Sequence, residues 1–200
     1  MRLEILHKGH NLRNRLALRV MGLVAGTEPD DVIKTSLYRP EFFGRAWIDL
    51  LHSVMRGPSD WTPGERELFA AFTSRLNTCR FCVGIHIGIT GIALDPQITT
   101  ESLDNWRHAG FKPHIVSTLD LLEKMTLAPG TITSDDILNL RARGISNNAI
   151  RDAMHVCFLF NLVNRLANAL DYNYGTEGDA LKAAAVLHRV QYNLPKFLLQ

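Results

Sequence analysis

The chain has 200 residues, of which 46% are hydrophobic and 21% are charged. This length and composition predict a single folded domain, residues 1–200, with a hydrophobic core. The net charge of +2 comes without a long run of lysine or arginine, which argues against nucleic acid as a partner. The longest nearly uncharged stretch, VGIHIGITGIAL (residues 83–94), is too short to span a bilayer, so we expect no membrane partner.

The N-terminal stretch RLALRVMGLVAG (residues 15–26) is apolar, but Arg19 interrupts it and the preceding region is long and mixed. It therefore does not predict a signal peptide, and we expect a cytoplasmic location. In that compartment, closely spaced cysteines serve redox chemistry or metal binding more often than a structural disulfide.

Helix signals recur along the chain, and no segment shows the alternating pattern of a strand. A short amphipathic piece follows GTEPDD, and a helix is predicted over 40–57 with Pro40 near its start and Gly57 at its end. Caps and terminal glycines predict further helices over 62–76, 112–127, 133–144, 146–170 and 176–194. The predicted fold class is all-α.

The helix over 62–76 has the clearest local signal. Thr62, Pro63 and Glu65 form a capping box with proline at the first helical position. Glu65 therefore belongs to the cap. Glu67 lies on a face with Ala70, Ala71 and Ser74, small side chains that leave room for another helix to approach.

The next helix is predicted to run from about Cys79 to Leu94, in the stretch NTCRFCVGIHIGITGIAL. At about 100° per residue, Cys79, Cys82 and His86 fall within roughly 60° of one another. A helix N-terminus lowers the pKa of a nearby thiol, and the thiolate is the nucleophile. A second thiol one turn away can condense with a sulfenic acid to give a disulfide. His86 can take or relay the proton, and Glu67 is a candidate to fix its tautomer.

Glycines form a separate stripe on this predicted helix. Gly84, Gly88 and Gly91 lie across from the thiols, and each interior glycine costs about 1 kcal/mol relative to alanine. The stripe suggests a closely approaching backbone, with a subunit or helix contact as the natural candidate. The alternative is a packed core helix with no role in symmetry.

The segment WTPGERELFAAFTSRLNTCRFCVGIH resembles the active-site segment of the alkyl hydroperoxide reductase D (AhpD) type, within the carboxymuconolactone decarboxylase superfamily. Glu67, Cys79, Cys82 and His86 have the spacing of that pattern, which lies in a segment of about 61–94. LYRPEFFG and FNLVNRLANAL are similar to peroxidase-related members. The resemblance implies an AhpD-like helical domain, a cofactor-free thiol peroxidase and a homo-oligomer.

In this family the second cysteine attacks the hydroperoxide, the first resolves the product, and glutamate and histidine relay protons. The resemblance therefore implies Cys82 as the attacking residue and Cys79 as the resolving one, with an external dithiol reductant such as a lipoyl or thioredoxin-like protein. Members of this type can carry a second histidine between the cysteines, where this chain has Phe81. That departure implies a shorter proton relay or a weaker activity.

Other interpretations stay open at this stage. Zinc would find three ligands in Cys79, Cys82 and His86 but no obvious fourth, so no metal is expected. Cys157 reads as a small buried residue. Asn161, Asn164 and Asn168 share a face with Asp171, as a polar seam between helices or a substrate wall. The alternative functions are a non-catalytic redox-responsive or structural oligomer and a lactone decarboxylase, although decarboxylases of the superfamily generally lack the CxxC.

Overall fold

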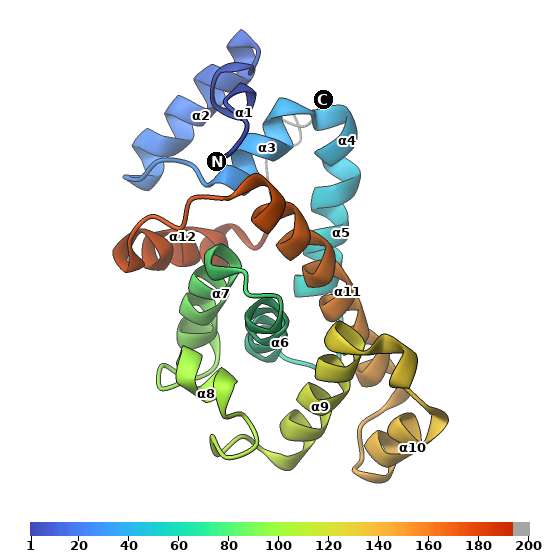
Figure 1. Cartoon of the computed structure of the whole chain (residues 1–200). Helices are drawn as coiled ribbons and strands as arrows, with labels where there is room; N and C mark the ends of the chain where they lie inside the picture. Colours follow the sequence, from blue (N-terminus) through green and yellow to red (C-terminus); the bar gives the residue numbers. More distant parts are fainter. Residues whose placement is uncertain (194–200) are drawn as a thin grey trace.

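The computed structural model describes residues 1–193, except for the side chains of residues 42 and 43. Within that part of the chain all regular structure is helical, as predicted (Figure 1). The helices are α1 (Ile5–Lys8), α2 (Leu12–Ala25), α3 (Asp31–Tyr38), α4 (Pro40–Phe43), α5 (Arg45–Arg56), α6 (Pro63–Leu76), α7 (Arg80–Ala93), α8 (Thr100–Asp104), α9 (Pro113–Leu127), α10 (Ser134–Ala142), α11 (Asn147–Leu170) and α12 (Glu177–Val190), with a 3-10 turn at Pro129–Thr131. Among these residues, no helix is long and apolar enough to cross a bilayer.

Helix α6 lies at the centre of the molecule and contacts α7, α9 and α11 (Figure 1). The predicted capping box is present, because Thr62 accepts from the backbone of Glu65 and the Glu65 carboxylate accepts from the backbone of Thr62. Leu68, Phe69 and Phe72 on this helix are fully buried in the main core. Two charged residues, Arg66 and Glu67, are buried on the same helix. Because buried charges need partners, these two point to a polar site inside the core.

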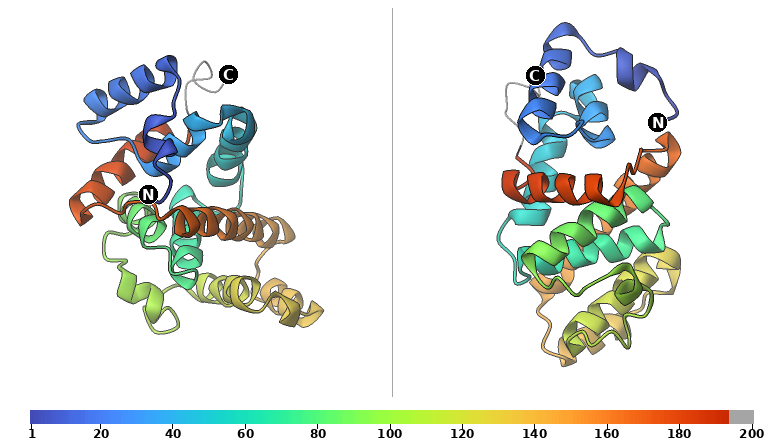
Figure 2. Two further views of the ribbon diagram at one scale, coloured as in Figure 1. Left: turned by 45° about the horizontal axis from the view of Figure 1, so that its top comes forward. Right: turned by 90° about the vertical axis from the view of Figure 1, so that its left-hand side faces the viewer.

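Helix α7 lies between α6 and α12, as the right-hand view of Figure 2 shows. A Cβ atom built on Gly84 would lie 2.2 Å from the Tyr174 ring, and one on Gly88 would lie 2.8 Å from the Cβ of Ala184. Gly91 has no such close neighbour. The close approach is therefore a contact with α12 and the loop before it. Of the two contacts expected for the glycine stripe, a subunit contact or a helix contact, Gly84 and Gly88 make the helix contact within the chain.

Two predicted helix boundaries differ from the structure. The helix expected over 40–57 is broken at Gly44, whose backbone (φ −79°, ψ −141°) separates α4 from α5. The last helix ends at Val190, where Gln191 takes a left-handed conformation, and residue 194 of the predicted range lies outside the described residues. The predicted boundaries of α6 and α11 agree with the structure to within one residue.

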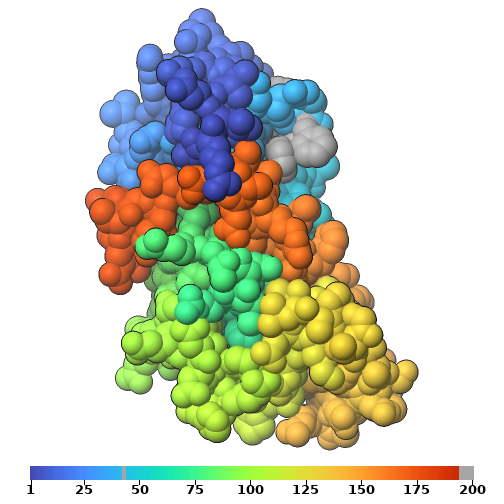
Figure 3. Space-filling view, in the orientation of Figure 1, coloured from blue at the N-terminus to red at the C-terminus, as the bar shows by residue number. Residues whose placement is uncertain are grey.

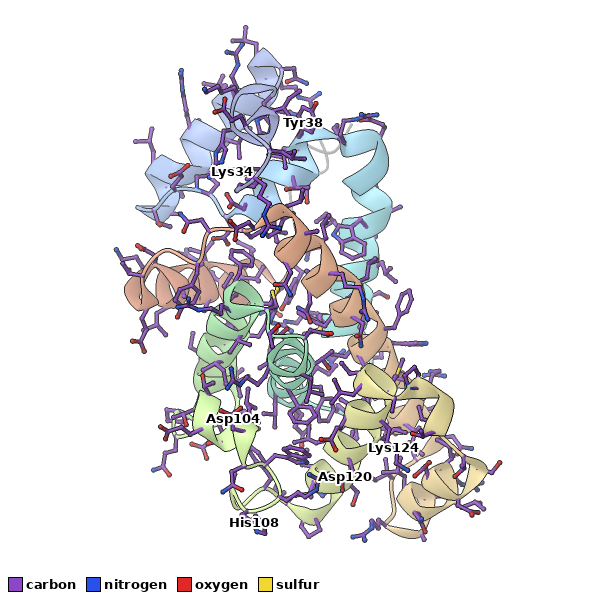
Figure 4. All side chains as sticks on the ribbon, in the orientation of Figure 1. Lys34, Tyr38, Asp104, His108, Asp120 and Lys124 are labelled. Atoms are coloured by element: carbon purple, nitrogen blue, oxygen red, sulfur yellow. The ribbon has the colours of Figure 1, made fainter. Side chains whose placement is uncertain are left out.

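The N-terminal helices form a layer above α11 and α12 (Figures 1 and 3). Lys34 on α3 forms ion pairs with Glu28 at 2.7 Å and Asp31 at 3.1 Å (Figure 4). The Asp31 carboxylate also accepts from the backbone N–H of Asn173, in the loop after α11. At the other end of the molecule, Lys124 on α9 pairs with Asp136 on α10 at 2.5 Å (Figure 4). The contacts of Lys34 and Asp31 hold the layer of N-terminal helices over one side of the candidate site.

Candidate active site

Glu67 and His86, predicted to lie together, are in direct contact between α6 and α7. The Nδ1 atom of His86 is 2.7 Å from Oε2 of Glu67, and both side chains are buried. The ring of Phe160 on α11 meets the His86 ring edge to face, with centroids 4.5 Å apart. The carboxylate accepts a hydrogen bond, so it selects the tautomer of neutral His86 that carries its proton on Nδ1.

Two residues that the sequence analysis did not identify complete this cluster. Arg56, the last residue of α5, donates from Nη2 to Oε1 of Glu67 at 2.5 Å. Tyr192 donates its hydroxyl to the same carboxylate, at 2.8 Å from Oε1 and 3.1 Å from Oε2. Tyr192 follows α12 in a left-handed conformation (φ 61°), which turns its side chain back toward the core. Glu67 thus has partners from α5, from α7 and from the segment after α12.

The electrostatics of the cluster favour an ionised Glu67. Burial alone would raise the pKa of Glu67, but the hydrogen bond from His86, together with the hydrogen bond and charge of Arg56, lowers this pKa below its ordinary value. Burial and the negative charge of Glu67 raise the pKa of Tyr192 well above its ordinary value. The tyrosine therefore keeps its proton and remains a hydrogen-bond donor to the carboxylate.

The two motif cysteines lie at the first turn of α7. Both are free thiols and almost fully buried, with Cys79 at the N-cap and 1% exposed and Cys82 one turn later and 2% exposed. A hydrogen bond from the Cys82 thiol lowers the pKa of Cys79, although burial opposes the shift. The same hydrogen bond, together with burial, raises the pKa of Cys82 well above its ordinary value. The lowered thiol pKa that the sequence predicts near the helix N-terminus is therefore that of Cys79. When one of the two thiols is ionised, the negative charge lies on the sulfur of Cys79.

The asparagines of α11 form a polar seam against the turn that precedes the cysteines. Asn77 donates from Nδ2 to the side-chain oxygens of Asn161 and Asn164, each at 3.1 Å. Asn168 donates to the carbonyl of Asn77 at 2.9 Å, and Asn164 donates to Ser74 at 2.9 Å. Of the two interpretations left open for these asparagines, these contacts are those of a polar seam. Its further effect is on the thiols, because a hydrogen bond from Asn164 lowers the pKa of Cys79 and opposes the rise at Cys82.

A cavity of about 500 Å³ opens beside the cluster. Its walls come from α2, α3, α5, α7, α11 and α12, and they are largely apolar; the residues include Met21, Ile33, Ile48, Ile85, Val163 and Leu187. Cys82, His86 and Tyr192 are among the lining residues, whereas Cys79 is not. Of the two thiols, Cys82 is therefore the one that a molecule in the cavity can reach.

The remaining candidates behave as structural residues. Within residues 1–193, no group of three or more His, Cys, Asp and Glu side chains is arranged to hold a metal ion. Cys157 is fully buried in the main core and lies 3.3 Å from the hydroxyl of Thr126. Burial raises the pKa of Cys157, which makes it a poor nucleophile.

Two of the solved structures that resemble the chain match it over most of its length. A peroxidase-related protein from Silicibacter sp. TM1040 matches with a TM-score of 0.70 and 27% identity, over 82% of this chain and 88% of the other. The alkylhydroperoxidase AhpD core of a peroxidase-related protein from Ralstonia eutropha JMP134 matches with a TM-score of 0.74 and 25% identity, over 88% of this chain and 92% of the other. The chain has an AhpD-like fold. No protein-family model and no curated protein matches the sequence.

Proposed function

We propose that this AhpD-like protein is a thiol-dependent peroxidase that reduces organic hydroperoxides with Cys79 and Cys82. The observation that carries the proposal is that His86 and Cys82, the latter hydrogen-bonded to Cys79, line the same apolar cavity. An apolar cavity of about 500 Å³ suits a hydroperoxide with a hydrocarbon chain or ring better than hydrogen peroxide. The peroxidase-related names of both structural neighbours support the same class of reaction.

In the proposed cycle, Cys82 attacks because it lines the cavity. The thiol pair first loses one proton to His86, which leaves the negative charge on Cys79. The thiol proton of Cys82 then passes to Cys79 along the hydrogen bond between them, so that Cys82 becomes the thiolate. The Cys82 thiolate attacks the terminal oxygen of the hydroperoxide and the O–O bond breaks. The alkoxide leaves as an alcohol with the proton from His86, and Cys82 becomes a sulfenic acid.

Cys79 then attacks the sulfenic acid through its own sulfur. A Cys79–Cys82 disulfide forms, and the hydroxyl of the sulfenic acid leaves with the thiol proton as water. An external dithiol, such as a lipoyl or thioredoxin-like protein, reduces the disulfide and is itself oxidised to a disulfide. We further propose that the enzyme works as a cytoplasmic homo-oligomer, as the family resemblance implies.

The test is steady-state consumption of cumene hydroperoxide with dihydrolipoamide as the reductant. We expect turnover by the wild-type protein and by Cys157→Ser, which leaves both motif thiols in place. Turnover by Cys82→Ser at the wild-type rate would overturn the proposal.

A second candidate is a redox-responsive protein without catalytic turnover. The burial of both thiols and the raised pKa of Cys82 favour slow reaction with peroxide. The two candidates differ in rate: a catalytic thiol reacts with the hydroperoxide far faster than free cysteine does, whereas a slowly reacting sensor does not.

A further inference from the structure

The cluster around Glu67 contains more than a proton relay needs. Arg56 and Tyr192 both donate to the carboxylate, and the Arg56 guanidinium also lies over the Tyr192 ring, 4.7 Å from its centroid. The side chain of Glu67 is fully buried and that of Arg56 is 3% exposed. A carboxylate paired in this way with a permanent cation holds its negative charge throughout the neutral pH range.

We infer that Arg56 and Tyr192 are positioning residues that keep Glu67 as a fixed anion, so that Glu67 orients His86 and does not itself carry a proton during turnover. This inference rests on the proposed peroxidase function. Because Glu67 occupies Nδ1 of His86, Nε2 is the ring nitrogen that His86 can present to the cavity it lines. The proton exchanged with the thiol pair and the leaving alkoxide then travels through Nε2 alone.

Arg56 also acts on the charge of Glu67 itself. Burial raises the pKa of this carboxyl, whereas the guanidinium of Arg56 and the hydrogen bond that it donates lower this pKa. Without Arg56, the buried carboxylate loses the cation that holds it ionised.

The pair formed by Glu67 and His86 has neighbours on four helices and in the segment after α12. They are Arg56 on α5 and Arg66 on α6, which act on Glu67, Cys82 on α7, which lines the same cavity as His86, the uncharged Phe160 on α11, and Tyr192 after α12. Of these, Arg56 is the cation hydrogen-bonded to the carboxylate. Arg66 donates to the backbone carbonyls of Val54 and Gly57 and acts on Glu67 through its charge alone, so Arg66 separates the effect of a nearby buried cation from that of the hydrogen bond.

The experiment combines two NMR measurements. In protein labelled with ¹⁵N-histidine, assigned with a His86→Gln variant, we expect the neutral ring of wild-type His86 to carry its proton on Nδ1. In protein labelled with ¹³C-glutamate, assigned with a Glu67→Gln variant, we expect Glu67 in Arg56→Met to take up its proton at a pH about one unit or more higher than in the wild type, a tenfold or greater gain in proton affinity. Arg56→Lys should restore most of the wild-type midpoint, and Tyr192→Phe should shift it upward by less. Arg66→Met, which removes a buried cation that is not hydrogen-bonded to Glu67, should shift it by less than Arg56→Met does.

The inference fails if folded Arg56→Met and Tyr192→Phe both titrate as the wild type does. It also fails if the wild-type ring carries its proton on Nε2, a result that does not depend on how well any variant folds. The titration needs neither hydroperoxide nor reductant. An inactive protein with the expected titration would therefore refute the peroxidase proposal and leave the role of Arg56 standing. An active protein whose midpoint is unshifted in the variants would refute the role of Arg56 and leave the peroxidase proposal standing.

Discussion

Replacing Glu67 with glutamine removes the negative charge that faces Arg56 in the core. The two side chains are 0% and 3% exposed, and Nη2 of Arg56 lies 2.5 Å from Oε1 of Glu67. Neither group recovers its hydration when the other is lost, and breaking a buried ion pair in this way costs about 3–5 kcal/mol. We expect Glu67→Gln to lower the free energy of unfolding by about 4 kcal/mol. For a 200-residue chain this corresponds to a fall in melting temperature of about 10 °C.

Arg56→Met should show a loss of similar size, because it leaves the Glu67 carboxylate buried without its cation. The double variant leaves no unpaired charge, so its loss should be smaller than the sum of the two single losses by about 2 kcal/mol. Urea unfolding followed by circular dichroism measures all four free energies. Arg75→Met is the control: its pair with Asp104 is exposed, and its loss should be under about 1 kcal/mol. Strictly additive losses in the double variant would refute the description of Arg56 and Glu67 as one coupled unit.

Three further predictions concern the thiols, the cavity wall and the glycines of α7. Cys82→Ser should abolish hydroperoxide consumption, whereas Cys79→Ser should stall with a dimedone-reactive sulfenic acid on Cys82; a sulfenic acid on Cys79 in the Cys82→Ser protein would reverse the assignment. Burial raises the pKa of Asp30 from 3.8 to about 6. Because the carboxyl ionises less readily in the folded state, the folded state loses stability as the pH rises between these two values. Asp30→Asn should therefore be more stable than the wild type at pH 7.5, by up to about 3 kcal/mol in urea unfolding, and should match it near pH 3; equal stability at both values would show that the carboxyl is solvated. Gly88→Val should destabilise the fold by about 1–3 kcal/mol without changing the mass measured by light scattering. Gly91→Ala, at an open position, should be neutral or stabilising. A change in mass with Gly88→Val would show that this face contacts another subunit.

The parts of the fold that the sequence predicts are those with local causes. The capping box at Thr62 and Glu65 is complete within four residues, so the start of α6 is readable before the structure is known. The break at Gly44 is different, because a glycine does not by itself end a helix: Gly84, Gly88 and Gly91 lie inside the unbroken helix α7. The spacing of the motif brings Glu67 and His86 together, since consecutive packed helices place them on facing sides.

The rest of the site depends on tertiary contacts that leave no local pattern. Tyr192 is 125 residues from Glu67 in sequence, and the left-handed backbone that turns it inward follows an ordinary helix end. Arg56 reads as a basic residue in the last turn of α5, a common and exposed position for arginine. The position of the thiolate depends on which sulfur donates to the other and on Asn164, and the spacing of the CxxC is the same in either case.

The central claim is that a hydroperoxide oxidises Cys79 and Cys82 to a disulfide. The most direct measurement mixes fully reduced protein with one equivalent of cumene hydroperoxide in a quenched-flow instrument and analyses both products by mass spectrometry. We expect one Cys79–Cys82 disulfide for each molecule of alcohol formed, at a rate well above that of free cysteine and with Cys157 still reduced. Reduced motif cysteines beside unconsumed hydroperoxide, after a time in which free cysteine has reacted, would contradict the claim.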